Sequence, residues 1–151
     1  MVCIQKQFRK SESILKVRFE SEKDIENELN VMNLICPDKQ FKKLGEHDLD
    51  FLVYDVRNGK NIGLCYIEIK CYKGKHDDYT TTMVSCIKYR KMMEKALPTY
   101  LFIQWNDKLV YINRNDISGE QRIGGRKVRE GSTNDQEMLI FVPMEKFNIY
   151  E

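Results

Sequence analysis

The order of strand-like and helix-like segments predicts an α/β domain, with a mixed β-sheet flanked by helices. Two segments that alternate polar and apolar residues, HDLDFLV and CYIEIKCY, are joined by a loop containing Asn58 and Gly59. This pattern predicts a β-hairpin. The apolar run TYLFIQW, residues 99–105, predicts a buried strand, and helical spacing before and after the hairpin predicts a helix on each side of it.

The first predicted helix runs from Ser21, a typical N-cap residue, to about Leu34. Glu28 lies beside its apolar stripe and is expected to point partly inward. Such a carboxylate either reaches a metal or accepts a hydrogen bond at the edge of the core. Residues 14–19 alternate and fit a short strand or an extended arm.

The second predicted helix runs from about Thr80 to Leu97, before Pro98. We expect its basic side chains to face water rather than a phosphate backbone. They are Lys88, Arg90, Lys91 and Lys95. After the buried strand, residues 108–112 and 138–143 predict two further strands.

The composition is typical of a soluble globular protein, with 42% hydrophobic and 32% charged residues. At 151 residues, one domain covering residues 1–151 is expected. No apolar run reaches the length of a membrane span, and the start MVCIQKQFRK lacks a signal-peptide core. The five cysteines form no C-x-x-C pair, and no zinc pattern is visible. We therefore expect an intracellular protein with reduced thiols and no membrane association.

A net charge of only +2 means that any contact with nucleic acid must come from a local patch. The best candidate is RIGGRKVR, residues 122–129, which contains no acid. Its glycines would let backbone amides approach a phosphate, and its arginines could make forked contacts to it. The alternative is an exposed loop whose charge only confers solubility. The basic residues are Arg122, Arg126, Lys127 and Arg129.

The two hairpin segments also contain the residues that could form a metal site. In a strand, residues two apart share a face, which places Asp48 with Asp50 and Glu68 with Lys70. The apolar residues Leu49, Phe51 and Val53 are expected on the opposite face. Antiparallel pairing would bring the carboxylates to one end of one surface. The alternative is an edge strand with a wet face, on which Asp48 or Asp50 forms a salt bridge with Lys70.

This order of elements resembles the PD-(D/E)XK nuclease superfamily over roughly residues 21–112. The matching features are a helix with a glutamate, an acidic strand start, a hairpin into an apolar Glu-x-Lys strand, then a helix and a buried strand. His47–Asp48 stands where the family usually has Pro–Asp, and Glu68-Ile69-Lys70 supplies the second motif. The resemblance implies a restriction-endonuclease-like core and favours Asp48 over Asp50 as the principal metal ligand.

The resemblance also implies a Mg²⁺-dependent nuclease, with Mn²⁺ able to substitute. Asp48, Glu68 and the carbonyl of Ile69 would hold the ion, with Asp50 as the alternative carboxylate. Lys70 would orient the attacking water and stabilise the phosphate, and Glu28 would bind a second metal or position the water. The expected substrate is DNA rather than RNA, cut endonucleolytically with weak sequence specificity or with structure specificity.

Two other classes remain open. One is a catalytically inactive nucleic-acid-binding or assembly protein with a nuclease-like fold, and the other is an interaction module with a salt-bridged hairpin. Double-strand cleavage by one small domain would need a homodimer, and the apolar faces of residues 99–112 and 138–149 are candidate interfaces.

Overall fold

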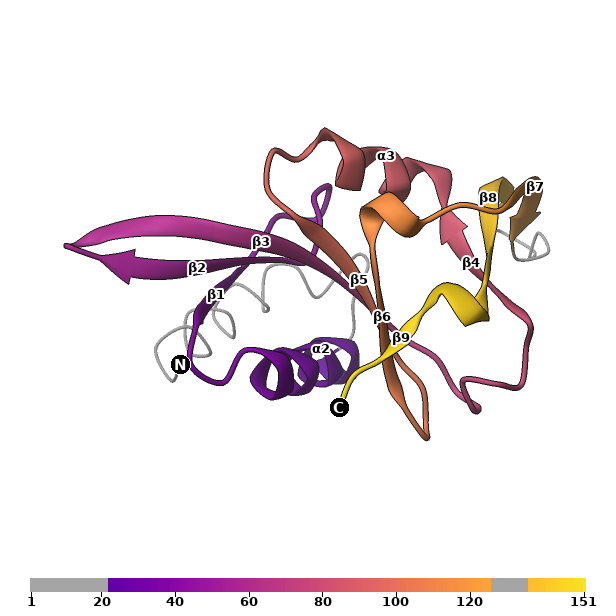
Figure 1. The fold of residues 1–151 in the computed structure, drawn as a ribbon, viewed down its shortest axis with the longest axis horizontal. Helices are drawn as coiled ribbons and strands as arrows, with labels where there is room; N and C mark the ends of the chain where they lie inside the picture. The colour runs from indigo at the N-terminus through magenta and orange to yellow at the C-terminus, as the bar shows by residue number, and fades with distance from the viewer. Residues whose placement is uncertain (1–21, 126–135) are drawn as a thin grey trace.

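The computed structural model describes residues 22–125 and 136–151 (Figure 1). It confirms the α/β class and the arrangement expected of a restriction-endonuclease-like core. The main sheet is mixed and has the strand order β1-β2-β3-β5-β6-β9, in which only β3 and β5 are parallel. A second, antiparallel sheet has the order β4-β8-β7. The elements are α2 (Glu22–Ile35), β1 (Gln40–Lys43), β2 (Phe51–Arg57), β3 (Lys60–Cys71), β4 (Thr81–Ser85), α3 (Cys86–Glu94), β5 (Thr99–Gln104), β6 (Leu109–Asn113), η1 (Arg114–Asp116), β7 (Glu120–Gly125), β8 (Gln136–Pro143), η2 (Met144–Lys146) and β9 (Asn148–Ile149).

The predicted hairpin is present as β2 and β3, whose tip projects from the rest of the molecule in Figure 1. Its turn is made by Asn58 and Gly59, with φ angles of 51° and 75°. Two consecutive left-handed residues match the twist of the paired strands, and Asn-Gly adopts this conformation with little strain. The turn therefore fixes the register in which Phe51 faces Ile67.

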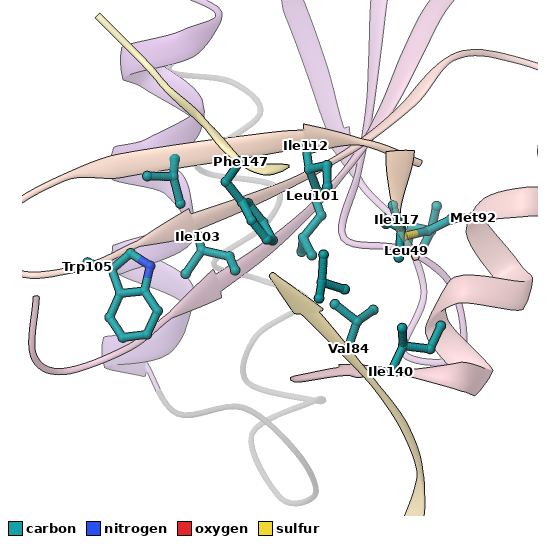
Figure 2. Packing of buried hydrophobic residues seen from close by; sticks show 12 residues of the cluster. Leu49, Val84, Met92, Leu101, Ile103, Trp105, Ile112, Ile117, Ile140 and Phe147 are labelled. Carbon is teal, nitrogen blue, oxygen red and sulfur yellow. The ribbon is translucent and has the colours of Figure 1, made fainter. Parts of the chain in front are cut away.

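The main sheet separates two hydrophobic cores, with α2 on one face and α3 on the other (Figure 1). Ile67 and Ile69 of β3 pack on the α2 side, whereas Glu68 lies between them in sequence and shares the α3 side with Leu101 of β5. Figure 2 shows the α3-side core, where side chains from both sheets and α3 meet. It contains Leu49, Val84, Met92, Leu101, Ile103, Trp105, Val110, Ile112, Ile117, Ile140, Val142 and Phe147.

The prediction of one helix over residues 80–97 is wrong at its start. Thr81–Ser85 forms β4, and the helix covers only Cys86–Glu94. Thr82 and Val84 are buried while Met83 between them is exposed, which is the alternation of a strand. β4 pairs with β8, some sixty residues later, so this long-range pairing overrides the local helical spacing.

The expected alternation along the first hairpin strand is also wrong at its start. Phe51 and Val53 pack on the α2 side, but Leu49 packs in the α3-side core. The strand begins only at Phe51, because the residues before it form a bend in which the amide of Leu44 donates to the carbonyl of Asp50 at 2.9 Å. Asp48 and Asp50 therefore do not share a strand face.

The other predicted elements agree closely with the structure. The first helix ends one residue beyond the predicted limit, and the strands predicted at 99–105, 108–112 and 138–143 are β5, β6 and β8. The proposed arm at residues 14–19 lies outside the described residues, as does Ser21. Within the described ranges, no helix is both long enough and apolar enough to cross a bilayer.

Gly119 provides a test of the close packing between the residue before β7 and the backbone of β8. A Cβ on this residue would lie 2.0 Å from the carbonyl oxygen of Phe141, a backbone atom that cannot move aside cheaply. Gly119→Ala should therefore lower the free energy of unfolding by about 1–3 kcal/mol in urea denaturation. Gly45→Ala is the control, because nothing lies within 4 Å of its Cβ position. Equal stability of the two variants would contradict this packing.

Candidate functional site

The carboxyl groups of Asp50 and Glu68 meet inside the protein, where the bend before β2 lies beside the C-terminal part of β3. Asp50 is 8% exposed and Glu68 is 2% exposed, and a hydrogen bond joins their side chains. Asp50 Oδ2 also accepts a 2.8 Å hydrogen bond from the amide of Ile69. The β3 backbone thus holds Asp50 against Glu68, so these two predicted residues are brought together.

Lys43, at the end of β1, holds the other side of Asp50. Its ammonium lies 3.1 Å from Asp50 Oδ1 and 2.9 Å from Glu28 Oε2, and it sits 5.1 Å from the centre of the Phe51 ring. Glu28 therefore points inward as predicted and is bound to Lys43. Through Lys43, helix α2 is tied to the Asp50–Glu68 pair.

Lys88 of α3 approaches the same pair from the other face of the sheet. Its ammonium lies 3.0 Å from Glu68 Oε2 and 3.5 Å from Oε1, and it donates a 3.2 Å hydrogen bond to the backbone carbonyl of Asp48. Despite this ion pair, Oε2 is a buried oxygen with no hydrogen-bond donor of suitable geometry among the described residues. Among the described residues this buried carboxylate oxygen therefore has the Lys88 ion pair and no well-directed hydrogen bond.

The environment separates the pKa values of the two carboxyl groups. Burial, and then the hydrogen bond and negative charge of Asp50, raises the pKa of Glu68 to about 8, against the opposing charge of Lys88. Burial acts to raise the pKa of Asp50 too, but the hydrogen bond with Glu68, the charge of Lys43 and the Ile69 amide lower it overall. The pair therefore holds one proton readily and resists carrying two negative charges without a further cation.

Asp48, the carboxylate that the sequence favoured as metal ligand, has different partners. Its Oδ1 lies 2.7 Å from Lys95 Nζ and accepts a 2.7 Å hydrogen bond from the amide of Leu49. Burial acts to raise its pKa, but the hydrogen bonds from Lys95 and Leu49 outweigh burial and lower it. No hydrogen bond or ion pair joins this carboxylate to Asp50 or Glu68 in the part of the chain that the structure describes.

The expected convergence of three acidic groups and Lys70 is therefore only partly realised. Over residues 22–125 and 136–151, no three of Glu28, Asp48, Asp50 and Glu68 present oxygens all within 4.8 Å of one another. Lys70 is half-buried on β3 opposite Ile103, and no hydrogen bond or ion pair joins it to a described side chain. The predicted salt bridge from Lys70 to Asp48 or Asp50 is absent from the same ranges.

The trio that does meet this distance limit is His76, Asp77 and Asp107, in the loops after β3 and β5. The Asp107 carboxylate accepts hydrogen bonds from the His76 amide at 2.9 Å and pairs with His76 Nδ1 at 2.7 Å. These bonds connect the loop after β3 to the loop after β5. The side chains of Asp77 and Asp107 are exposed to solvent. The trio is a loop contact, with no buried polar atom left unsatisfied.

The expectation that the basic side of the second helix faces water is wrong for three of its four residues. Lys88 contacts Glu68, Lys91 donates to the carbonyl of His47, and Lys95 pairs with Asp48. Their spacing of three and four residues puts them on one face of α3, and Arg90 is exposed. With Asp48, Lys91 and Lys95 line a surface cavity of about 710 Å³.

Sequence reasoning missed Lys43 and Lys88 as members of the site. Lys88 was visible as part of a basic helix face, but nothing in the sequence shows that this face turns toward the sheet. Lys43 carries no local signal, because its partners Glu28 and Asp50 lie fifteen and seven residues away. Both depend on tertiary placement.

The basic patch is described only in part. Arg122 lies in β7, with its guanidinium 3.8 Å from the centre of the Phe141 ring and 3.5 Å from Glu120. Arg122 therefore packs along the second sheet, and its partners are an aromatic ring and a neighbouring acid. The other three basic residues, Arg126, Lys127 and Arg129, lie outside the described residues.

Comparison with known protein families finds a match over most of the chain. The family described as "Phage putative PDDEXK endonuclease" matches residues 14–150, which is most of the chain. The match includes every element that contributes to the Asp50–Glu68 pair. No match to a curated protein was found.

The raised pKa of Glu68 predicts a pH-dependent stability. In the unfolded chain Glu68 titrates near 4.5, whereas in the folded protein its pKa is about 8. The folded state keeps a proton that the unfolded state has released, so this contribution to stability is lost as pH rises through that window. Glu68→Gln removes this titrating group, and with it the pH dependence that Glu68 causes. The free energy of unfolding of Glu68→Gln should therefore rise relative to wild type between pH 5 and 8, by up to about 1.4 kcal/mol per pH unit.

Urea denaturation at several pH values measures this difference. Glu26→Gln, at an exposed position of the α2 helix that carries Glu28, is the matched control for replacing a glutamate by glutamine. A Glu68→Gln difference that stays flat from pH 5 to 8 would show that Glu68 titrates normally.

Proposed function

The chain belongs to the PDDEXK endonuclease family that matches residues 14–150, and so to the PD-(D/E)XK nuclease superfamily. We propose that it is a metal-dependent nuclease in which Asp50 and Glu68 are the acidic residues that bind the metal. The observation that carries the proposal is the buried carboxyl pair, in which Glu68 Oε2 has an ion pair with Lys88 but no hydrogen bond of suitable geometry among the described residues. Burying two acids together is costly unless a cation or proton is shared between them. In a nuclease site, a bound metal ion would be the cation that the two carboxylates share.

The donor set fits a hard divalent cation. Mg²⁺ prefers carboxylate and carbonyl oxygens and is usually held by one or two carboxylates together with substrate phosphate. Nucleases of this superfamily use divalent metals; here Asp50 and Glu68 would hold Mg²⁺, or Mn²⁺ in its place, with the carbonyl of Ile69 as a further oxygen. When bound, such an ion lowers the pKa of a coordinated water and offsets negative charge on the phosphate.

The surrounding residues would position this pair. Lys43 fixes the orientation of Asp50, and Glu28 fixes Lys43 through the 2.9 Å ion pair. Glu28 would then act on Asp50 through Lys43, in place of the second-metal role that the sequence suggested. Asp48 would belong to the rim of the site, because its carboxylate is 39% exposed and bound to Lys95. Lys70 follows Glu68 by two residues on β3, where it would lie beside the same sheet face.

Nucleic acid is the substrate class that this chemistry serves, and we propose DNA cut endonucleolytically. The lysine side of α3 would provide the positive charge that a phosphate backbone needs near the carboxylates. Because the sequence shows no base-reading motif, we expect weak sequence specificity or recognition of nucleic-acid structure.

The choice between the two aspartates is the sharpest test of this site. Asp50→Asn and Glu68→Gln should each lower metal-dependent cleavage by more than about 100-fold, because each removes a ligand charge from the buried pair. Asp48→Asn is the matched control and should stay within about 3-fold of wild type, since its carboxylate lies outside that pair. Cleavage is measured on labelled single-stranded, duplex and junction DNA and the matching RNAs, with Mg²⁺, Mn²⁺ or EDTA.

A cooperative urea-unfolding transition in each variant, with the wild-type dependence on urea concentration, would establish that the variants are folded. Loss of cleavage in Asp48→Asn with full activity in Asp50→Asn would reverse the assignment. If wild type cleaves none of the substrates with any of the metals, the protein is a binding or assembly protein with this fold, and the proposal fails.

A further inference from the structure

A cavity of about 430 Å³ lies where β3 and β5 end and β4 begins, away from the Asp50–Glu68 pair. Trp105, which follows β5, forms part of its wall. Figure 2 shows Trp105 at one end of the α3-side core and Met92 at the other. The volume falls within the range of small-ligand sites, roughly 300–1,000 Å³. The cavity is therefore large enough for one small ligand.

The wall of this cavity, here called the aromatic pocket, contains four aromatic side chains, Tyr72, Tyr79, Trp105 and Phe141. The rings of Tyr72 and Trp105 contact each other, with their centres 5.1 Å apart. Tyr79 is 65% exposed, so its ring is accessible to a ligand. Aromatic side chains bind flat rings by stacking, and every nucleobase has such a face. The lining therefore suits a planar ligand.

Backbone contacts hold the walls of the aromatic pocket in place. The amide of Asn106 donates a 2.9 Å hydrogen bond to the carbonyl of Gly74, beside the contact between Asp107 and His76. On the opposite wall, the amide of Met144 donates to the carbonyl of Thr80 at 2.8 Å. The loop between Tyr72 and Tyr79 is thus connected to the rest of the domain at both ends. A site formed in advance loses less entropy when its ligand binds.

The aromatic pocket continues the line of the proposed metal site along β3. Glu68, Lys70 and Tyr72 are spaced by two residues and share the α3 side of the sheet. The amide of Tyr72 donates to the carbonyl of Gln104 at 2.9 Å, which extends the parallel ladder beyond the last residue of β3. Four residues of strand span roughly 13 Å. A nucleic-acid strand bound at Glu68 would therefore reach the pocket within a few nucleotides.

The charges beside the aromatic pocket balance one another. The loop over residues 73–79 contains two lysines and two aspartates. Lys73 is exposed and belongs to the pocket wall, where its ammonium can bind the phosphate of a nucleotide whose base lies inside. A loop with balanced charge does not attract a polyanion strongly by itself. Stacking is therefore the main interaction that this pocket offers.

We propose that the aromatic pocket binds an unpaired nucleobase of the nucleic acid, a few nucleotides from the bond that is cleaved. The choice of nucleic acid as the occupant rests on the proposed nuclease function. A base within a duplex must leave its stack before it can enter such a pocket, whereas a base in a single strand is already available. The pocket would thus recognise nucleic-acid structure rather than sequence, by favouring substrates with unpaired nucleotides.

The emission of Trp105 tests the proposal directly, because the chain contains one tryptophan. Full-length protein is titrated in EDTA, which prevents metal-dependent cleavage, with tetrathymidylate and with an abasic tetranucleotide of the same backbone. Affinities are also measured from the anisotropy of labelled forms of both. Tetrathymidylate should change the emission and bind about 10-fold more tightly than the abasic form, the value expected for one stacked base.

Variants of Tyr79 separate stacking from other contacts. Tyr79→Ala should weaken the binding of tetrathymidylate by about 10-fold and leave the abasic form within about 2-fold, because only the stacking surface is lost. Tyr79→Phe keeps the ring and should bind as wild type does. Ile87→Ala is the control for removing an exposed large side chain, since Ile87 is 63% exposed and outside the pocket wall. It should also bind as wild type does.

Equal affinity of wild type for tetrathymidylate and the abasic form would overturn the proposal, as would full affinity in Tyr79→Ala. A change in Trp105 emission on adding N-acetylphenylalaninamide, with none on adding tetrathymidylate, would show a site for a protein side chain and would also overturn it. Cleavage is scored separately. Wild type that cleaves DNA without base-dependent binding loses only the pocket assignment, whereas base-dependent binding by a protein that cleaves nothing keeps the pocket and removes the nuclease function.

Discussion

The contact between the carboxyl groups of Asp50 and Glu68 is the constraint on which the rest of the site depends. Two acids buried side by side repel each other once both are ionised, and water is too scarce there to screen them. Three contacts offset this repulsion. The Ile69 amide donates a hydrogen bond to Asp50, Lys43 forms an ion pair with Asp50, and Lys88 forms an ion pair with Glu68. Over the described ranges, Glu68 Oε2 has the ion pair with Lys88 but no hydrogen bond of suitable geometry. Structural stability alone gives no reason to keep such a pair.

The fold explains how one pair can be reached from both helices. β3 is central in the sheet, so its successive residues face opposite cores, and Glu68 faces α3. Asp50 lies in the bend before β2, which frees its side chain from strict alternation. It can therefore contact Glu68 and also Lys43, which is tied to Glu28 of α2. The bend lets groups from both faces of the sheet act on the same two carboxylates.

The sequence predicted what depends on local pattern. The Asn58–Gly59 turn, the alternating strands, the α2 helix and the position of Glu68 on β3 all follow from spacing and turn chemistry over short distances. The contact of Asp50, and not Asp48, with Glu68 was not predictable, because it follows from where β2 begins. Lys88 and β4 were missed for a related reason. Which side of α3 meets the sheet, and whether residues 81–85 pair with β8, are decided by residues distant in sequence.

The most direct test of the account is the position of a bound divalent ion. Crystals soaked in Mn²⁺ and measured for anomalous scattering should show a peak between the carboxylates of Asp50 and Glu68. The same peak should be lost in Glu68→Gln. A peak found only at His76, Asp77 and Asp107, or bound to Asp48 without Asp50, would contradict the account.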